Sequence, residues 1–392
     1  MKRKINSLFS ERRLILDSSM VFSASFIGAI FMFASSVALS RIFSPEIFGN
    51  YKTLVNLFLF IPALLDFGAS PTLTRYIAGF MAKKEEGKIN RMIRFFLKIK
   101  GISVLSVSLM IYLSRDAFAG TFLKDSSLSY LIVPGLLLSV SFLFDLTKPV
   151  ISGLQDFRLL SFSNFLTTAC IGIFSIVLGY YYGVYYALLG WSLAYFAGNL
   201  PNIYHISKRR LFSKNSLSLD IGPIFRSYAL PMQMMMILNT SSLAVIPVLS
   251  LFFAQKLIGY YGFAWTFYSG IMLVPITFSQ VLFPKVSELK ANNKATRSSI
   301  VSILAVYTLI VLTGVTAIHL FSPEIISLVS AAYLPGLHIF RWLNIAGLLL
   351  GYLFIYANYL SAKGSIRSAS IVFFVMNMAL FAVSFALLFS WA

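Results

Sequence analysis

Residues 51–80 read YKTLVNLFLFIPALLDFGASPTLTRYIAGF, a stretch that is long and apolar enough to cross a lipid bilayer. A helix that spans the hydrocarbon core needs about 20 predominantly apolar residues. The stretch is interrupted by a carboxylate at Asp66 and by two helix breakers, Gly68 and Pro71. It therefore predicts a membrane helix that is broken beside a charge.

The composition of the whole chain agrees with this interpretation. Of its 392 residues, 58% are hydrophobic and 11% are charged, and the mean hydropathy is +0.82. Soluble domains carry about 25% charged residues, so an ordinary soluble enzyme is excluded. The 38 Phe and 20 Tyr exclude disorder, and the single cysteine, Cys170, excludes an intramolecular disulfide.

Eleven apolar runs of spanning length follow one another along the chain. They lie near residues 18–40, 51–80, 95–114, 129–152, 160–181, 183–206, 224–250, 258–284, 298–320, 336–361 and 367–391. The sequence therefore predicts an all-α, polytopic membrane protein.

The basic residues give the orientation of these helices. Lys and Arg gather in alternate connections, for example between Lys83 and Lys100. The opposite side holds only Arg41, Lys52, Arg115, Lys124, Lys256 and Arg341. Because positive charge marks the cytoplasmic side, the N-terminus is predicted to be cytoplasmic. The same clusters account for the net charge of +19, so no nucleic-acid partner is expected.

A repeat at an offset of 210 residues relates the two halves of the chain. Val37–Tyr51 reads VALSRIFSPEIFGNY, and Pro247–Tyr261 reads PVLSLFFAQKLIGYY. The identities include Gly49/Gly259 and Tyr51/Tyr261. A duplicated lobe predicts two parallel six-helix lobes with a substrate path between them, as in transporters.

The repeat also sets the limits of the predicted lobes. The first comprises residues 1–206, a basic cytoplasmic linker follows at 207–222, and the second comprises residues 223–392. The offset predicts that the last helix of the second lobe would begin just past residue 392, so we expect either a truncated chain or a protein that works with eleven helices.

The stretch from Ala38 to Ala78 resembles the first-to-second helix signature of Wzx-type O-antigen and capsule flippases. These belong to the multidrug/oligosaccharidyl-lipid/polysaccharide (MOP) exporter superfamily. The matching parts are SPEIFG at Ser44–Gly49, DFG at Asp66–Gly68, and the pair Arg75 and Tyr76. Phe321–Gly336, FSPEIISLVSAAYLPG, is similar to the outer loop after the family's ninth helix.

The resemblance implies a MATE-like fold and transport rather than enzymatic activity. The implied substrate is an undecaprenyl-pyrophosphate-linked oligosaccharide repeat unit, flipped across the bacterial inner membrane. Membrane lipids, a polysaccharide polymerase and a chain-length regulator are the implied partners. A drug/cation antiporter, a lipid II flippase and a membrane glycosyltransferase or polymerase remain as alternatives.

Charges within the predicted spans are the candidate ion-coupling residues, because each needs a partner or a wet cavity. Asp66 lies at the break of the second span. The break is expected to place its carboxylate beside a cation or a proton path. The alternative is a structural carboxylate that is bonded to a neighbouring helix end or to Arg75. Asp145 and Lys148 stand three residues apart in the fourth span and are predicted to form an ion pair on one helical face.

Cations in or near the spans are the candidate contacts for a pyrophosphate, which cannot cross hydrocarbon unpaired. These are Arg41, Lys52, Arg75 and Arg341. Arg41 and Lys52 have the alternative of extending to lipid headgroups. The polar pair Asn239 and Thr240 in the seventh span either lines the cavity or bonds across a helix interface.

The sequence predicts no cofactor and no metal site. His205, His319 and His338 are far apart and lack metal-ligand spacing. There is no Walker A loop, dinucleotide fingerprint or nucleophile elbow. Transport is therefore expected to draw on an ion gradient, the membrane potential or the substrate gradient.

Overall fold

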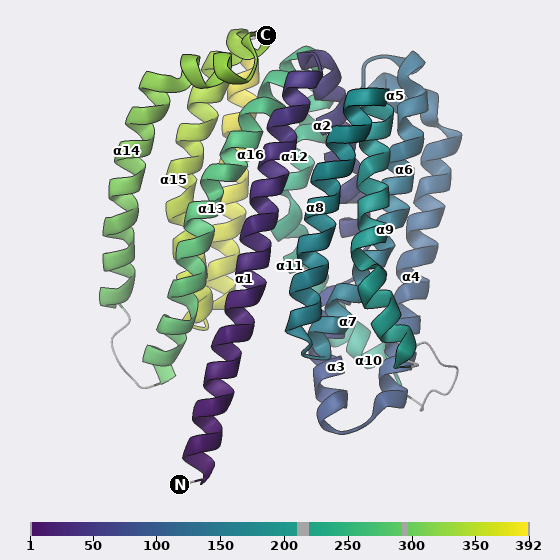
Figure 1. The fold of residues 1–392 in the computed structure, drawn as a ribbon, viewed down its shortest axis with the longest axis vertical. Coiled ribbons are helices and arrows are strands. Elements are labelled where there is room, and N and C mark those ends of the chain that lie inside the picture. Colours follow the sequence, from purple (N-terminus) through teal and green to yellow (C-terminus); the bar gives the residue numbers. More distant parts are fainter. Residues whose placement is uncertain (1, 210–218, 292–296, 391–392) are drawn as a thin grey trace. The chain divides into compact units, whose positions relative to one another are not determined.

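The computed structural model describes residues 2–209, 219–291 and 297–390, and this part of the chain forms helices and turns without strands (Figure 1). The all-α prediction is confirmed. In chain order the elements are α1 (Lys2–Ile42), α2 (Pro45–Leu64), α3 (Ala69–Ala82), α4 (Glu86–Leu113), α5 (Arg115–Phe122), η1 (Ser126–Leu131), α6 (Ile132–Ser141), η2 (Phe142–Leu146), α7 (Thr147–Gly153), α8 (Phe157–Tyr182), α9 (Val184–Lys208), α10 (Gly222–Ile224), η3 (Phe225–Ala229), α11 (Leu230–Thr240), α12 (Ser242–Phe252), α13 (Gln255–Ala291), α14 (Arg297–Val329), η4 (Ala331–Gly336), α15 (Leu337–Ala362) and α16 (Ile366–Phe389).

Each predicted span coincides with a helix or with a broken helix. Among the described residues, nine helices are long and apolar enough to cross a membrane, and the bent pair from Gly222 to Phe252 raises the number to ten. The sixth predicted span is α9, which has 25 residues but lies outside these nine. It carries buried Asn199 and Asn202. The chain is a multi-pass membrane protein.

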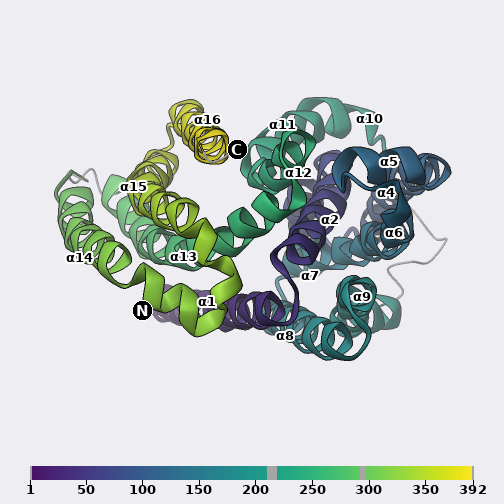
Figure 2. The same cartoon turned by 90° about the horizontal axis from the view of Figure 1, so that it is seen from above.

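The first compact unit comprises Met1–Ser35, Phe58–Phe118 and Ser127–Met236. Within it, α8 and α9 lie side by side (Figures 1 and 2). Gly190 and Gly198 of α9 allow this approach, since a Cβ at either position would overlap α8. A separate apolar cluster joins α3, α4 and α7, and its buried members include Leu73, Ile89 and Ile151.

The second compact unit comprises Ser36–Leu57, Ala119–Ser126 and Ile237–Ala392. Its centre is the packing of α15 on α13 and α14. Gly347 receives the ring of Tyr268, and Gly351 receives the ring of Tyr307, whose hydroxyl donates to Leu348 O at 2.7 Å. The predicted lobes 1–206 and 223–392 with their linker at 207–222 stay a prediction, and most of that linker lies outside the described residues.

The two repeated segments have the same local structure. A helix ends at Ile42 and the next begins at Pro45, and 210 residues later a helix ends at Phe252 and the next begins at Gln255. Both turns are followed by a glycine at a backbone contact: a Cβ at Gly49 would overlap Gln255 O, and one at Gly259 would overlap Pro45 O. The equivalent glycines thus hold the start of α2 against the start of α13.

Candidate functional site

The second span is broken between α2 and α3, as its sequence predicts. Phe67 and Gly68 adopt left-handed backbone conformations, with φ of 51° and 68°. A Cβ at position 68 would overlap the carbonyl oxygen of Ala229 in η3, so only glycine fits this turn. The break therefore has a fixed geometry that depends on DFG and on the segment packed against it.

Asp66 caps the new helix and pairs with a lysine. Its carboxylate accepts from Ser70 N at 3.0 Å, and its Oδ1 lies 2.6 Å from Lys100 Nζ. Both residues are deeply buried, at 4% and 2% exposure, and Lys100 Nζ also lies 5.3 Å from the centre of the Phe142 ring. The helix-end alternative for Asp66 is confirmed, whereas the suggested pairing with Arg75 is wrong because Lys100 of α4 occupies that position.

Gln233 of α11 bonds to the backbone groups at the break between α2 and α3. Its side-chain amide donates to Leu64 O at 2.7 Å and to Ala63 O at 3.3 Å, and its oxygen accepts from Gly68 N at 2.8 Å. A broken helix frees backbone groups that are costly to leave unpaired in a membrane, and one buried side chain satisfies three of them. Neither Gln233 nor Lys100 is predicted as a site residue, because the first lies in a Met-rich run and the second in a basic cluster.

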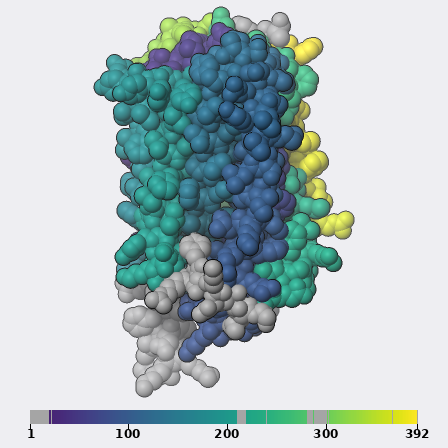
Figure 3. All heavy atoms as spheres, turned by 90° about the vertical axis from the view of Figure 1, so that its right-hand side faces the viewer, coloured from purple at the N-terminus to yellow at the C-terminus, as the bar shows by residue number. Residues whose placement is uncertain are grey.

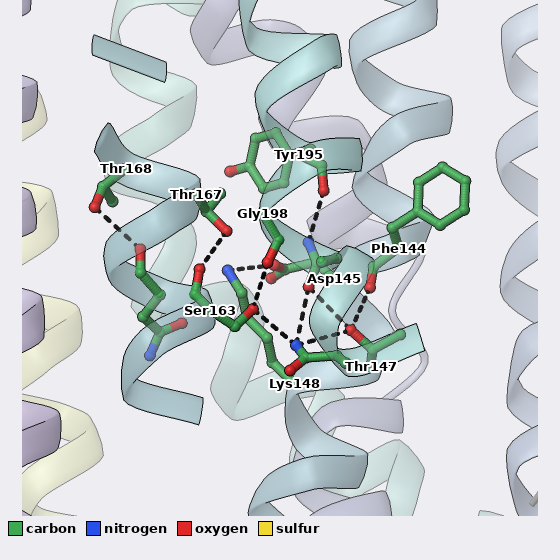
Figure 4. Close-up of polar contacts among 12 residues, drawn as sticks. Phe144, Asp145, Thr147, Lys148, Ser163, Thr167, Thr168, Tyr195 and Gly198 are labelled. Carbon is green, nitrogen blue, oxygen red and sulfur yellow. Dashed lines mark hydrogen bonds and ion pairs between the residues drawn. The ribbon is translucent and has the colours of Figure 1, made fainter. Parts of the chain in front are cut away.

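A second polar cluster lies inside the same unit, between η2, α7, α8 and α9 (Figure 4). Asp145 Oδ1 lies 2.6 Å from Lys148 Nζ, so the predicted ion pair is confirmed. Next to it, Thr147 donates to Asn199 Oδ1 at 2.9 Å, and Asn202 donates to Ser163 Oγ at 2.8 Å. Ion coupling by Asp145 and Lys148 stays a prediction.

Arg75 lies on α3 with an exposed side chain. Its guanidinium carbon is 4.4 Å from the centre of the Tyr228 ring and 5.9 Å from that of Tyr76. Stacking on aromatic rings orients the guanidinium, which also contacts the hydroxyl group of Tyr228. Among the residues that the structure describes, no carboxylate lies within ion-pair distance of Arg75.

Lys52 of α2 lies in the second unit, where its ammonium group bonds to a serine hydroxyl. Its Nζ donates to Ser36 Oγ at 2.7 Å and lies 5.2 Å from the centre of the Phe48 ring, and Ser36 Oγ lies 2.8 Å from Thr266 Oγ1. Within the described ranges no carboxylate pairs with it either. The described partners of this half-buried lysine are therefore neutral groups.

The other predicted cations contact the C-terminal part of α14. Arg41 donates to Leu328 O at 2.6 Å and to Val329 O at 3.0 Å, which caps the end of that helix. Arg341 Nε donates to Ser322 Oγ at 2.6 Å. Arg41 therefore has a sufficient structural role, whereas the guanidinium of Arg341 has one neutral partner.

The predicted polar pair in the seventh span is only partly described. Thr240 makes a local contact of 3.5 Å to Ile237 O, and the side chain of Asn239 lies outside the described residues. In the ranges that the structure describes, no group of three or more His, Cys, Asp or Glu residues forms a metal site.

With this geometry established, similarity to known proteins decides the family. Residues 15–290 match the family described as "Polysaccharide biosynthesis protein". The chain belongs to this family. The residues that carry the resemblance noted in the sequence, Ser44–Gly49, Asp66–Gly68 and Arg75, lie at the first turn, at the broken helix and at the stacked guanidinium.

One relative of this polysaccharide biosynthesis protein is an uncharacterized membrane protein of Methanocaldococcus jannaschii. It is 24% identical over 354 residues, which cover 86% of this chain and 81% of the relative.

Two solved structures resemble this chain in fold. A multidrug resistance MATE family transporter of the MOP superfamily, in an inward-facing conformation, has a TM-score of 0.67 at 12% identity and covers 95% of this chain and 97% of its own. The lipid II flippase MurJ, in an inward closed conformation, has a TM-score of 0.64 at 16% identity. The match covers 94% of this chain and 87% of MurJ. The expected MATE-like fold is thus confirmed.

Proposed function

We propose that the chain is a flippase that carries undecaprenyl-pyrophosphate-linked oligosaccharide repeat units across the cytoplasmic membrane by alternating access. The family and the fold support transport in polysaccharide biosynthesis. The N-terminus is placed in the cytoplasm, and a polysaccharide polymerase and a chain-length regulator are the proposed partners.

The observation that carries this proposal is the set of cations without carboxylate partners in the described part of the chain. Arg75, Lys52 and Arg341 lie in or beside spans and contact aromatic rings or hydroxyl groups. A charge at membrane depth is costly unless it is compensated. A diphosphate supplies that compensation, and guanidinium groups bind phosphate oxygens in a bidentate manner.

A transporter of cationic drugs would have the opposite electrostatics. Its site would need carboxylates or aromatic rings open to a cation, whereas Asp66 and Asp145 are each bonded to a lysine. Those two pairs are proposed as the coupling elements.

Arg75 gives the direct test of the proposed anion contact. We expect Arg75→Ala to abolish surface polysaccharide in a flippase-deletion strain that carries the cognate sugar pathway, while Arg75→Lys restores part of it, because lysine keeps the charge but not the bidentate geometry. Since Arg75 is exposed, its removal should leave the thermal unfolding of the protein essentially unchanged. Immunoblotting of the membrane fraction checks the protein level.

Arg367→Ala is the matched control, because Arg367 is an exposed cation at the start of α16. It should leave surface polysaccharide unchanged. Wild-type polysaccharide from the Arg75→Ala variant would contradict the proposed phosphate contact. Failure of the wild-type chain itself, followed by rescue of a lipid II flippase deletion, would shift the substrate to lipid II.

A further inference from the structure

An apolar pocket lies inside the first unit. Its volume is about 160 Å³, and it lies between α3, α4, η2, α7 and α9. The lining is aliphatic and aromatic except for Thr147, and it includes Leu73, Leu97, Leu143, Phe144, Val150 and Ile206. A cavity lined in this way does not hold ordered water, so its natural occupant is apolar.

The pocket reaches the lipid-facing surface of α4 at Leu97. This side chain lines the pocket and is also 40% exposed. Leu105 and Leu109, which are 54% and 60% exposed, lie on the adjacent face of α4, so Leu97 stands at the edge of the exposed side of this helix. Figure 3 views the first unit from the side on which α4 lies. The mouth of the pocket is thus continuous with a surface that hydrocarbon chains cover.

Basic side chains begin where this apolar stripe ends. Arg91, Arg94 and Lys98 stand at i, i+3 and i+7 of α4, on the face next to Leu97. On α9, Lys208 and Arg209 follow the pocket residue Ile206. The described carboxylates of these elements include Glu86 in the first turn of α4, Glu85, which lies 2.8 Å from Lys88, and Asp156, which lies 3.9 Å from His205. Cations at the end of a lipid-facing stripe lie at the level of headgroup phosphates.

We propose that the pocket binds an acyl chain of an anionic phospholipid whose phosphate contacts the cations of α4. The apolar lining accommodates the chain, the opening at Leu97 admits it from the bilayer, and the basic rim selects a negative headgroup over a zwitterionic one. Bound there, the lipid fills the space between α3, α4, α7 and α9 next to the Asp145 cluster. This site is independent of the proposed flippase function.

Photo-crosslinking from inside the pocket tests this assignment. A benzophenone amino acid replaces Leu97 in the full-length chain, which is reconstituted in equimolar phosphatidylglycerol and phosphatidylcholine with the same acyl chains. Mass spectrometry then gives the ratio of the two lipids in the adducts. We expect phosphatidylglycerol to be enriched roughly fivefold in the adducts, which is the change in affinity that one interfacial cation provides. The same label at Leu105 gives the bulk lipid ratio and serves as the internal control.

Two variants separate the pocket from general surface charge. Lys98→Gln should lower the enrichment at position 97, whereas Arg367→Gln, an exposed cation of the second unit, should leave it unchanged. Leu143→Trp should reduce the adducts at position 97 without affecting those at 105, because the indole fills the pocket. Equal lipid ratios at positions 97 and 105 would overturn the proposal. Crosslinks to residues 210–218 would overturn it as well, because the chain itself would then fill the pocket.

Discussion

Lys100 and Lys52 are two lysines at membrane depth with opposite surroundings. Lys100, in the first unit, lies 2.6 Å from a buried carboxylate that also caps a helix. Lys52, in the second unit, is held by a serine hydroxyl and an aromatic ring. The first charge is compensated by the fold itself, and we propose that an anionic substrate compensates the second. The difference separates charges that maintain the structure from charges available to a substrate.

The largest expected effect comes from breaking the compensated pair. Lys100→Met leaves the carboxylate of Asp66 buried without a cation, which should destabilise the protein by about 3–5 kcal/mol. Thermal unfolding in detergent, followed by the loss of monodisperse protein, measures the effect.

The double variant Asp66→Asn, Lys100→Met sharpens this test. Because neither charge remains, it should recover most of the lost stability, as replacement of a buried pair by neutral residues usually does. A double variant as unstable as Lys100→Met alone would mean that Asp66 acts through its helix cap and not through the pair.

A smaller loss is expected at the break itself. Gln233→Leu removes the partner of Gly68 N, Ala63 O and Leu64 O, which should cost about 1–3 kcal/mol. Gln233→Glu is the informative comparison, since it keeps an acceptor for Gly68 N and loses both donors. If Gln233→Leu unfolds at the wild-type temperature, the break does not depend on α11.

The smallest effect on stability is expected at Lys52. Lys52→Met removes a charge that has no carboxylate partner in the described part of the chain, so the free energy of unfolding should change by less than about 0.5 kcal/mol or rise slightly. Surface polysaccharide should nevertheless fall. A destabilisation similar to that of Lys100→Met would erase the distinction between the two lysines.

Much of the fold could be predicted from the sequence, because membrane spans have a strong local signal. The apolar runs, the break at Asp66 and the pairing of Asp145 with Lys148 all depend on residues that are close in sequence. The 210-residue repeat even matches the helix ends at Ile42 and Phe252.

The partners of the site residues could not be predicted in the same way. Lys100 and Gln233 reach Asp66 and Gly68 from distant parts of the chain, and neither carries a motif. Arg41 has the sequence pattern of a substrate contact, but the carbonyl groups that it caps come from α14. Tertiary contact, not residue type, decides which cation has a structural partner.

The most direct measurement is the binding of undecaprenyl-pyrophosphate-linked oligosaccharide to the purified protein in lipid nanodiscs. We expect saturable binding that undecaprenyl pyrophosphate displaces. Lys52→Met and Arg75→Ala should each weaken this binding. The Asp66→Asn, Lys100→Met double variant should bind as the wild type does. Equal binding by all these variants, or displacement by a cationic drug and not by the pyrophosphate, would contradict the claim that the cations without carboxylate partners bind the substrate.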